Sequence, residues 1–430
     1  MAGALRALLP SFPRLRYCIF AGTNTWREWW IACRALARLE RPDQEGVVRE
    51  YERTFADRVR VRHGVSFGAG RMALYAILEA LNIGPDDEVI ISGYTCVVVP
   101  NAVIYRGAKP IYSDIELRTF NQIPSGIESL ITSRTRAIVA QHSFGVPCDL
   151  DAIIRIGEKY RIPVIEDCGH AQGALYRGKA VGGIGLAGFF TTDHTKISST
   201  HLGGMATTDS DELAARLRQI QDKAGFLERR DHMRLLLSFV LEFILYSPAI
   251  FWIGRPALAV LNRLRILFYW RDELLTRRPT RYPYPARLSA QQAAIGLSQL
   301  RGLDRNLSHR RSIARALDTR LGWSGLSADE REASAWLRYS LLVNDRAAFE
   351  RRYRKQFDLG IWFTSVVHGR SDDLDKVHYR QGSCPNAEFA SMHVVNFPTH
   401  QRVPLTLMAK IAERDGGWIS GQLIPAADAG

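Results

Sequence analysis

The sequence predicts an α/β fold with a doubly wound, mainly parallel sheet, and three observations support this prediction. Short apolar segments that are typical of buried strands lie at 88–92, 110–113, 137–141 and 163–166. Helical patterns stand between these segments, as the crossovers of parallel strands require. The 430 residues are 46% hydrophobic and 23% charged. This composition is typical of a globular chain of two or three domains and excludes wholesale disorder, collagen and coiled coil.

The elements are expected in four regions of the chain. Residues 1–45 form an N-terminal arm rich in Arg and Trp, and residues 46–230 form a large domain that contains the alternating strands and helices. Its helices are expected at 70–82, 96–106, 123–133, 149–160 and 211–225. Residues 231–280 form an apolar insertion and a connector. Residues 281–430 form a smaller C-terminal α+β domain, in which apolar residues at helical spacing predict one long helix over 288–320.

The charge and the cysteines indicate which partners and which cellular compartment to expect. The formal net charge is +13, and 49 of the 57 basic residues are Arg, an excess that favours phosphate or carboxylate partners. The six cysteines have no CxxC spacing, so neither a metal site nor a disulfide framework is predicted, and a reducing cytoplasm fits best. Arg and Pro break the apolar stretches of residues 1–20, so no signal peptide is expected. No motif of a nucleic-acid-binding domain is present in the sequence.

The apolar stretch Leu235–Ile253 is about long enough to span a bilayer. Glu242 and Pro248 interrupt it, and a single span would separate the two halves of the chain. A buried or interfacial pair of helices is therefore expected. A helix that lies on a membrane surface is the remaining alternative, because four arginines follow, at Arg255, Arg263, Arg265 and Arg271.

Ligands of open α/β sheets bind at the carboxyl ends of the strands, where three features of this sequence fall. The first is Gly68-Ala69-Gly70-Arg71, directly before a predicted helix. Glycines let a backbone approach a ligand, and the N–H groups of a helix N-terminus favour phosphate. A simple glycine turn is the alternative.

The second feature is Asp167 at the end of a strand, with His170 three residues later. This carboxylate can hold a cationic ring nitrogen or cap a helix.

The third feature is Lys196, one of only eight lysines, in a polar segment that Gly203 and Gly204 follow. Lysine forms Schiff bases when burial or a cationic neighbour lowers the pKa of its amine, although most lysines lie on the surface. Together the three features offer a phosphate cup, a carboxylate for a ring nitrogen and a reactive amine. Pyridoxal phosphate (PLP) needs all three.

On these residues the chain resembles the DegT/DnrJ/EryC1/StrS family of PLP-dependent sugar aminotransferases, from about Glu52 to about Ile411. The strongest segments are 69–90, 107–121, 164–185, 196–214 and 287–304, and the apolar insertion is the main break. The resemblance implies the PLP-dependent transferase fold type I, which is aspartate-aminotransferase-like, with 46–230 as the PLP-binding domain. It also implies pyridoxal 5'-phosphate as the cofactor and a homodimer.

The resemblance also implies roles for single residues. Lys196 corresponds to the lysine that attaches to the cofactor and moves the proton between carbon atoms. Asp167 corresponds to the partner of the pyridine nitrogen, and His170 to the residue beside the phenolic oxygen. The phosphate-binding positions correspond to Gly70, Arg71 and Thr191.

Four positions depart from the family pattern. Arg71 replaces a hydroxyl-bearing residue and offers a charged donor to phosphate. Cys96 occupies the cofactor-facing position where relatives often have a stacking aromatic ring, so Tyr94 or another residue is expected to cover the ring. Pro285 replaces an Asn that reaches the neighbouring subunit's phosphate. The segment 193–195, Asp-His-Thr, is atypical before the lysine.

The implied function is transfer of an amino group, with glutamate as the expected donor, to a keto carbon of a nucleotide-linked deoxysugar. The product would serve cell-surface polysaccharide or glycoside biosynthesis. Lys196 favours transamination over dehydration, because the dehydratase relatives carry His in its place. Another PLP reaction, such as sugar dehydration or cyclitol amination, and a non-catalytic scaffold or regulator at the membrane are the alternatives. The apolar insertion suggests peripheral membrane contact through 235–271.

Overall fold

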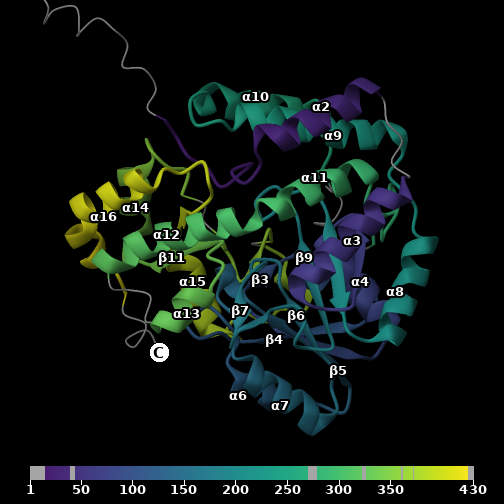
Figure 1. Cartoon of the computed structure of the whole chain (residues 1–430). Coiled ribbons are helices and arrows are strands. Elements are labelled where there is room, and N and C mark those ends of the chain that lie inside the picture. Colours follow the sequence, from purple (N-terminus) through teal and green to yellow (C-terminus); the bar gives the residue numbers. More distant parts are fainter. Residues whose placement is uncertain are drawn as a thin grey trace, which may run out of the picture.

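A seven-stranded sheet forms the centre of the computed structural model, which describes residues 15–38, 44–269, 278–321, 326–359, 362–370 and 372–424 (Figure 1). The strand order is β1-β10-β9-β6-β5-β2-β4. All neighbours are parallel except β10, which is antiparallel to both β1 and β9. The predicted mainly parallel sheet is therefore confirmed. The strands are β1 (His63–Phe67), β2 (Glu88–Ser92), β4 (Lys109–Ser113), β5 (Thr135–Gln141), β6 (Val164–Asp167), β9 (Ala187–Thr191) and β10 (Gly204–Thr208).

Both faces of this sheet are buried. Successive side chains of a strand point to opposite faces, and here they enter two different cores. Val89 and Ile91 of β2 belong to one buried cluster, whereas Ile90 between them belongs to another. Helices pack on both clusters, as a doubly wound sheet requires. The helices around the sheet are α3 (Glu45–Val59), α4 (Gly70–Ala80), α5 (Val98–Tyr105), α6 (Pro124–Ser129), α7 (Leu150–Tyr160) and α8 (Asp211–Lys223). The helix expected over 123–133 is shorter than predicted and ends at Ser129.

The single helix predicted over 288–320 is wrong: two helices, α11 (Ala290–Arg301) and α12 (Leu303–Leu321), meet at Gly302. The apolar periodicity continues across Gly302, so it does not reveal the interruption. Ser289 and Gln292 form a capping box that starts α11. Helix α11 packs against α3 of the large domain, whereas α12 packs against α16 (Leu405–Ser420) of the C-terminal region. The two helices thus join the two regions, and the boundary of the small domain at residue 281 stays a prediction.

The C-terminal region has the expected α+β character. Strands β11 (Arg338–Leu342) and β13 (Val394–Pro398) pair antiparallel, and the short β12 (Val367–His368) pairs parallel with β3 (Thr95–Cys96). The remaining helices of this region are α13 (Ala328–Ala333), α14 (Arg346–Tyr353), α15 (Pro385–His393) and α16 (Leu405–Ser420). A small hairpin of β7 (Leu175–Tyr176) and β8 (Lys179–Ala180) lies in the large domain. The pairing of β12 with β3 brings the C-terminal region to the edge of the site.

The apolar insertion forms a helical pair, as expected, with α9 (Arg229–Leu245) and α10 (Phe251–Arg263) on either side of Pro248. In the arm, α2 (Trp26–Arg38) packs against α9, and Figure 1 shows the three helices together above α11. The indole Nε1–H of Trp29 donates to the carbonyl of Val240 at 3.2 Å, which ties the arm to the insertion. Within the described part of the chain, no helix has the length and apolar character needed to cross a membrane.

Candidate active site

A cavity of about 280 Å³ lies at the carboxyl ends of β6 and β9, where the sequence predicts the site. Seven residues to which the sequence analysis gives a cofactor or catalytic role line this cavity: Gly70, Arg71, Cys96, Asp167, His170, Thr191 and Lys196. They come from the start of α4, from β3, from the ends of β6 and β9 and from the loop after β9. The structure thus brings together residues that are far apart in the sequence. Pro285 is not among the lining residues.

The N-terminus of α4 makes a close contact with the end of β9. A Cβ atom on Gly70 would lie 2.6 Å from the Cβ of Thr191, so only glycine fits this position. The first N–H groups of α4 and the hydroxyl of Thr191 therefore lie at the same end of the cavity, which Arg71 also lines. A helix N-terminus with an adjacent guanidinium fits a phosphate group.

Asp167 supplies a buried carboxylate at the end of β6. Its Oδ1 accepts a hydrogen bond from the N–H of Gly169 at 2.9 Å. Burial raises the pKa of Asp167, while this hydrogen bond and the charge of Lys196 act in the opposite direction. A buried carboxylate is stabilised by a cationic partner. A protonated pyridine nitrogen is such a partner, so this residue fits the cofactor.

His170 is a neutral donor in the same cavity. Its Nδ1 accepts a hydrogen bond from the N–H of Phe144 at 3.2 Å, so Nε2 carries the proton. Burial, together with the charges of Lys196 and Arg338, holds the pKa of His170 well below its ordinary value. Its ring also stacks on that of Phe144, with the centroids 5.8 Å apart. The imidazole therefore offers one N–H group in a fixed orientation.

Lys196 lies in the loop between β9 and β10, with 9% of its surface exposed. Burial lowers the pKa of its amine to about 8, against the opposing charge of Asp193. Its carbonyl accepts a hydrogen bond from the hydroxyl of Thr23 at 2.9 Å, so the N-terminal arm holds this loop. Near neutral pH a part of the amine is unprotonated, which is the nucleophilic form.

Aromatic residues of the C-terminal region complete the cavity, and the sequence analysis did not assign them to it. Trp362, Phe363 and His368 line it, and the Nζ of Lys196 lies 4.9 Å from the centroid of the Trp362 ring. Tyr94 does not line it; its hydroxyl instead accepts a hydrogen bond from the N–H of Phe363 at 3.1 Å. Of the expected alternatives, Tyr94 or another residue, Tyr94 does not reach the cavity, whereas the indole of Trp362 lies beside the Lys196 amine.

Arg338 is a further residue that the sequence analysis did not find. It begins β11 and has 2% of its surface exposed, and its guanidinium carbon lies 4.6 Å from the centroid of the Trp362 ring. Its Nε and Nη2 have no hydrogen-bond partner in the described part of the chain. A buried guanidinium without an anion is costly, so this group is suited to receive a carboxylate. No local pattern marks it, because only the packing of β11 buries it.

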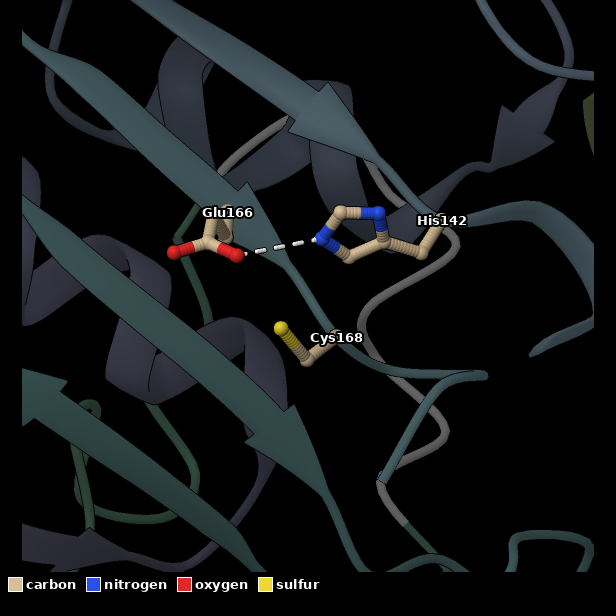
Figure 2. Close-up of side chains that lie close together, drawn as sticks. All are labelled: His142, Glu166 and Cys168. Atoms are coloured by element: carbon tan, nitrogen blue, oxygen red, sulfur yellow. Dashed lines mark hydrogen bonds and ion pairs between the residues drawn. The ribbon is translucent and has the colours of Figure 1, made fainter. Parts of the chain in front are cut away.

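A second cluster of ionisable residues, His142, Glu166 and Cys168, lies in the sheet at the ends of β5 and β6 (Figure 2). Nε2 of His142 lies 3.3 Å from Oε2 of Glu166. Glu166 also accepts hydrogen bonds from three backbone N–H groups, those of Gly182, Ile184 and Gly185, at 2.7, 2.7 and 2.8 Å. These contacts join β6 to the following loop, so the cluster has a structural role.

Comparisons with known proteins identify the family of this chain. The DegT/DnrJ/EryC1/StrS aminotransferase family matches residues 32–239 and 267–414. A GDP-perosamine synthase of Caulobacter vibrioides is 30% identical over 362 residues, which are 82% of this chain and 84% of that protein.

Solved structures share the fold. An aminotransferase from Psychrobacter cryohalolentis superposes with a TM-score of 0.71 at 23% identity, over 93% of this chain and 98% of that chain. An E. coli GDP-4-keto-6-deoxy-D-mannose-3-dehydratase with bound hydrated PLP gives a TM-score of 0.71 at 19% identity, over 93% and 99%. With the family match covering most of its length, the chain belongs to the DegT/DnrJ/EryC1/StrS aminotransferase family.

Proposed function

We propose that this chain is a PLP-dependent aminotransferase that transfers an amino group from an amino acid to a keto carbon of a nucleotide-linked sugar. The observation that carries the proposal is the cavity in which the buried amine of Lys196, the carboxylate of Asp167 and the N-terminus of α4 come together. The similarity to a GDP-perosamine synthase supports a nucleotide-linked sugar as the acceptor.

Six of the lining residues have a task in this proposal. Asp167 keeps the pyridine nitrogen protonated, and the N–H of His170 Nε2 binds the phenolic oxygen. The phosphate is held at the N-terminus of α4 by Gly70, Arg71 and Thr191. The cofactor supplies an electron sink that stabilises negative charge on the substrate carbon. The Lys196 amine takes the proton from the carbon of the amino donor and later gives a proton to the sugar carbon.

Arg338 is proposed to receive the carboxylate of the amino donor, for which glutamate is the candidate. Its two unpartnered nitrogens and its contact with Trp362 support this assignment. Glutamate brings the anion that a buried guanidinium lacks, and an Arg pairs with a carboxylate through two parallel hydrogen bonds. An Arg338→Lys variant should therefore raise the KM for glutamate at least tenfold and leave the KM for the sugar unchanged.

The first experiment is the near-visible absorbance of the protein with PLP, before and after addition of glutamate. The wild type should show a coloured band that collapses with glutamate, and Lys196→Ala should show no such band. Lys223→Ala, an exposed lysine on α8, is the matched control and should behave like the wild type. A wild type that develops no band would contradict the proposal and favour a non-catalytic scaffold. Chromatography of the products formed from candidate keto-sugars then identifies the acceptor.

We also propose that the protein is a cytoplasmic homodimer that contacts the inner face of the membrane through α10. Ile253, Val260 and Leu264 stand on one face of this helix and are 76%, 57% and 64% exposed, while the buried stripe at Phe251 and Leu258 faces α9. Three arginines of this segment, at Arg255, Arg263 and Arg265, suit anionic lipid headgroups.

Vesicle binding tests this contact. The protein should sediment with vesicles that contain anionic lipid and not with zwitterionic vesicles, and an Ile253→Glu/Leu264→Glu variant should lose the binding. Leu405→Glu, at an exposed position on α16, is the control. A change of oligomeric state in the α10 variant, without any vesicle binding by the wild type, would assign this face to a contact between copies of the chain.

A further inference from the structure

A carboxylate from the apolar insertion reaches the loop that carries Lys196. Glu242 lies in the last turn of α9 and is 1% exposed. Its Oε2 lies 2.7 Å from Nδ1 of His194, two residues before the lysine, and its Oε1 accepts a hydrogen bond from the hydroxyl of Tyr269. An unpaired carboxylate would be costly in an apolar helix, and this contact with His194 supplies the counter-charge.

His194 lies between two carboxylates. Its Nε2 is 3.3 Å from Oδ1 of Asp193, and Asp193 lines the cavity beside the lysine. Burial lowers the pKa of His194, but the charges of Glu242 and Asp193 outweigh this effect and raise the pKa to about 9. Burial raises the pKa of Glu242, but His194 and His201 lower it to about 2. The His194 cation thus lies between the side chains of Glu242 and Asp193.

One partner of this ion pair lies outside the family match. The family matches 32–239 and 267–414, so Glu242 falls in the segment that it does not match. His194 lies within the matched part, two residues before the lysine. A carboxylate from the unmatched segment therefore contacts the loop that carries Lys196.

We infer that Glu242 is a positioning residue, which holds the lysine loop through His194 and keeps Asp193 turned toward His194 rather than toward the Lys196 amine. The inference rests on the proposed function, in which this amine attaches to the cofactor. Besides Glu242 and Asp193, the groups that face His194 are the ring of His201, the phenol of Tyr269 and the Lys196 amine. Burial keeps the pKa of His201 at about 4, so His201 is neutral and cannot replace the cation.

Loss of Glu242 should change the protonation of the lysine. Without this carboxylate, buried His194 releases its proton to solvent at neutral pH, because only Asp193 still opposes the desolvation. Lys196 then loses a nearby cation, and Asp193 is free to pair with its amine. Both changes favour the protonated amine, which is not nucleophilic.

The test is the rate at which the apoprotein takes up PLP between pH 6 and pH 10, followed by absorbance. Glu242→Gln should shift the midpoint of the rate profile to higher pH by about one unit, a shift that corresponds to about tenfold slower uptake near pH 7. Raising the pH should restore the wild-type rate, a rescue that a merely structural defect would not give. Asp231→Asn makes the same charge change on the same helix, at a residue that pairs with Arg234, and should leave the midpoint unchanged.

Two further variants keep the inference falsifiable if Glu242→Gln does not fold. His194→Asn and the double variant Glu242→Gln/His194→Asn leave no unpaired histidinium, and both should show the same upward shift. A folded variant with the wild-type midpoint would overturn the inference. Stoichiometric divalent metal in the purified wild type would also overturn it, because a metal would then join His194, His201 and Glu242. If the wild type takes up no PLP at any pH, the proposed function fails instead.

Discussion

Two buried glutamates lie beside histidines in this protein, and their other neighbours give them different roles. Glu166 accepts hydrogen bonds from three backbone N–H groups in the segment between β8 and β9, and it also lies beside His142, which follows β5. Glu242 binds the side chains of His194 and Tyr269. A carboxylate that binds backbone groups fixes the course of the chain. One that binds a side chain of the lysine loop can instead influence the chemistry beside it.

The largest effect on stability is expected for Glu166→Gln. The amide has one acceptor oxygen where the carboxylate has two, and its NH2 group faces backbone donors. The free energy of unfolding should fall by about 3–5 kcal/mol, because charged hydrogen bonds are lost and buried N–H groups are left without acceptors. Urea unfolding followed by circular dichroism measures this loss, with Glu158→Gln on the exposed face of α7 as the control. A loss below about 1 kcal/mol would remove the contrast between the two glutamates.

A smaller and pH-dependent loss is expected for Glu242→Gln. The pKa of His194 is raised from 6.5 to about 9 in the folded protein, so its stabilisation is complete below pH 6.5 and is lost as the pH rises through 9. The pKa of Glu242 is lowered from 4.5 to about 2, so its stabilisation is present above pH 4.5 and is lost as the pH falls through 2.

The difference in unfolding free energy between wild type and Glu242→Gln should therefore be greatest between pH 4.5 and 6.5. It should reach about 2–3 kcal/mol there and decrease toward pH 9. Urea titrations at pH 6 and pH 9 measure the change. A difference that is equal at the two pH values would show that no ion pair forms between Glu242 and His194.

Tyr269→Phe should weaken the Glu242 contacts without removing the charge. The phenol donates one hydrogen bond to this carboxylate, and the loss of a hydrogen bond to a charged group costs about 1.5–3 kcal/mol. The pH midpoint of PLP uptake should move less than in Glu242→Gln, because Glu242 still holds His194. Tyr282→Phe is the control, because it also removes a tyrosine hydroxyl. It tests whether the loss of such a hydroxyl in the segment after the insertion is sufficient to move the pH midpoint. A midpoint shift in Tyr269→Phe as large as that of Glu242→Gln would assign the control of the lysine to the tyrosine.

The sequence was sufficient for the features that local patterns encode. Buried apolar segments predicted β2 and β6 to within one residue at each end, and strand-end geometry predicted the place of Asp167. The break at Gly302 was missed, because the apolar face continues through it. Trp362 and Arg338 were missed because only the packing of the C-terminal region brings them to the lysine. Glu242 stood out in the sequence only as an interruption of an apolar stretch, although a carboxylate inside a buried helix requires a partner.

The smallest effect on the pH midpoint is expected where the N-terminal arm holds the same loop through an uncharged side chain. The hydroxyl of Thr23 donates to the carbonyl of Lys196 at 2.9 Å and accepts from Nη2 of Arg310 at 3.1 Å. Thr23→Val keeps the shape and removes both hydrogen bonds, at a cost in stability of about 2–4 kcal/mol, because one of them comes from the charged guanidinium of Arg310. The dissociation constant for PLP, measured by fluorescence titration, should rise severalfold, while the pH midpoint of uptake stays at the wild-type value because no charge changes. Thr23→Ser should restore the affinity. A shifted midpoint in Thr23→Val would show that any loosening of the loop alters the lysine, and the ion pair of Glu242 would then have no separate role.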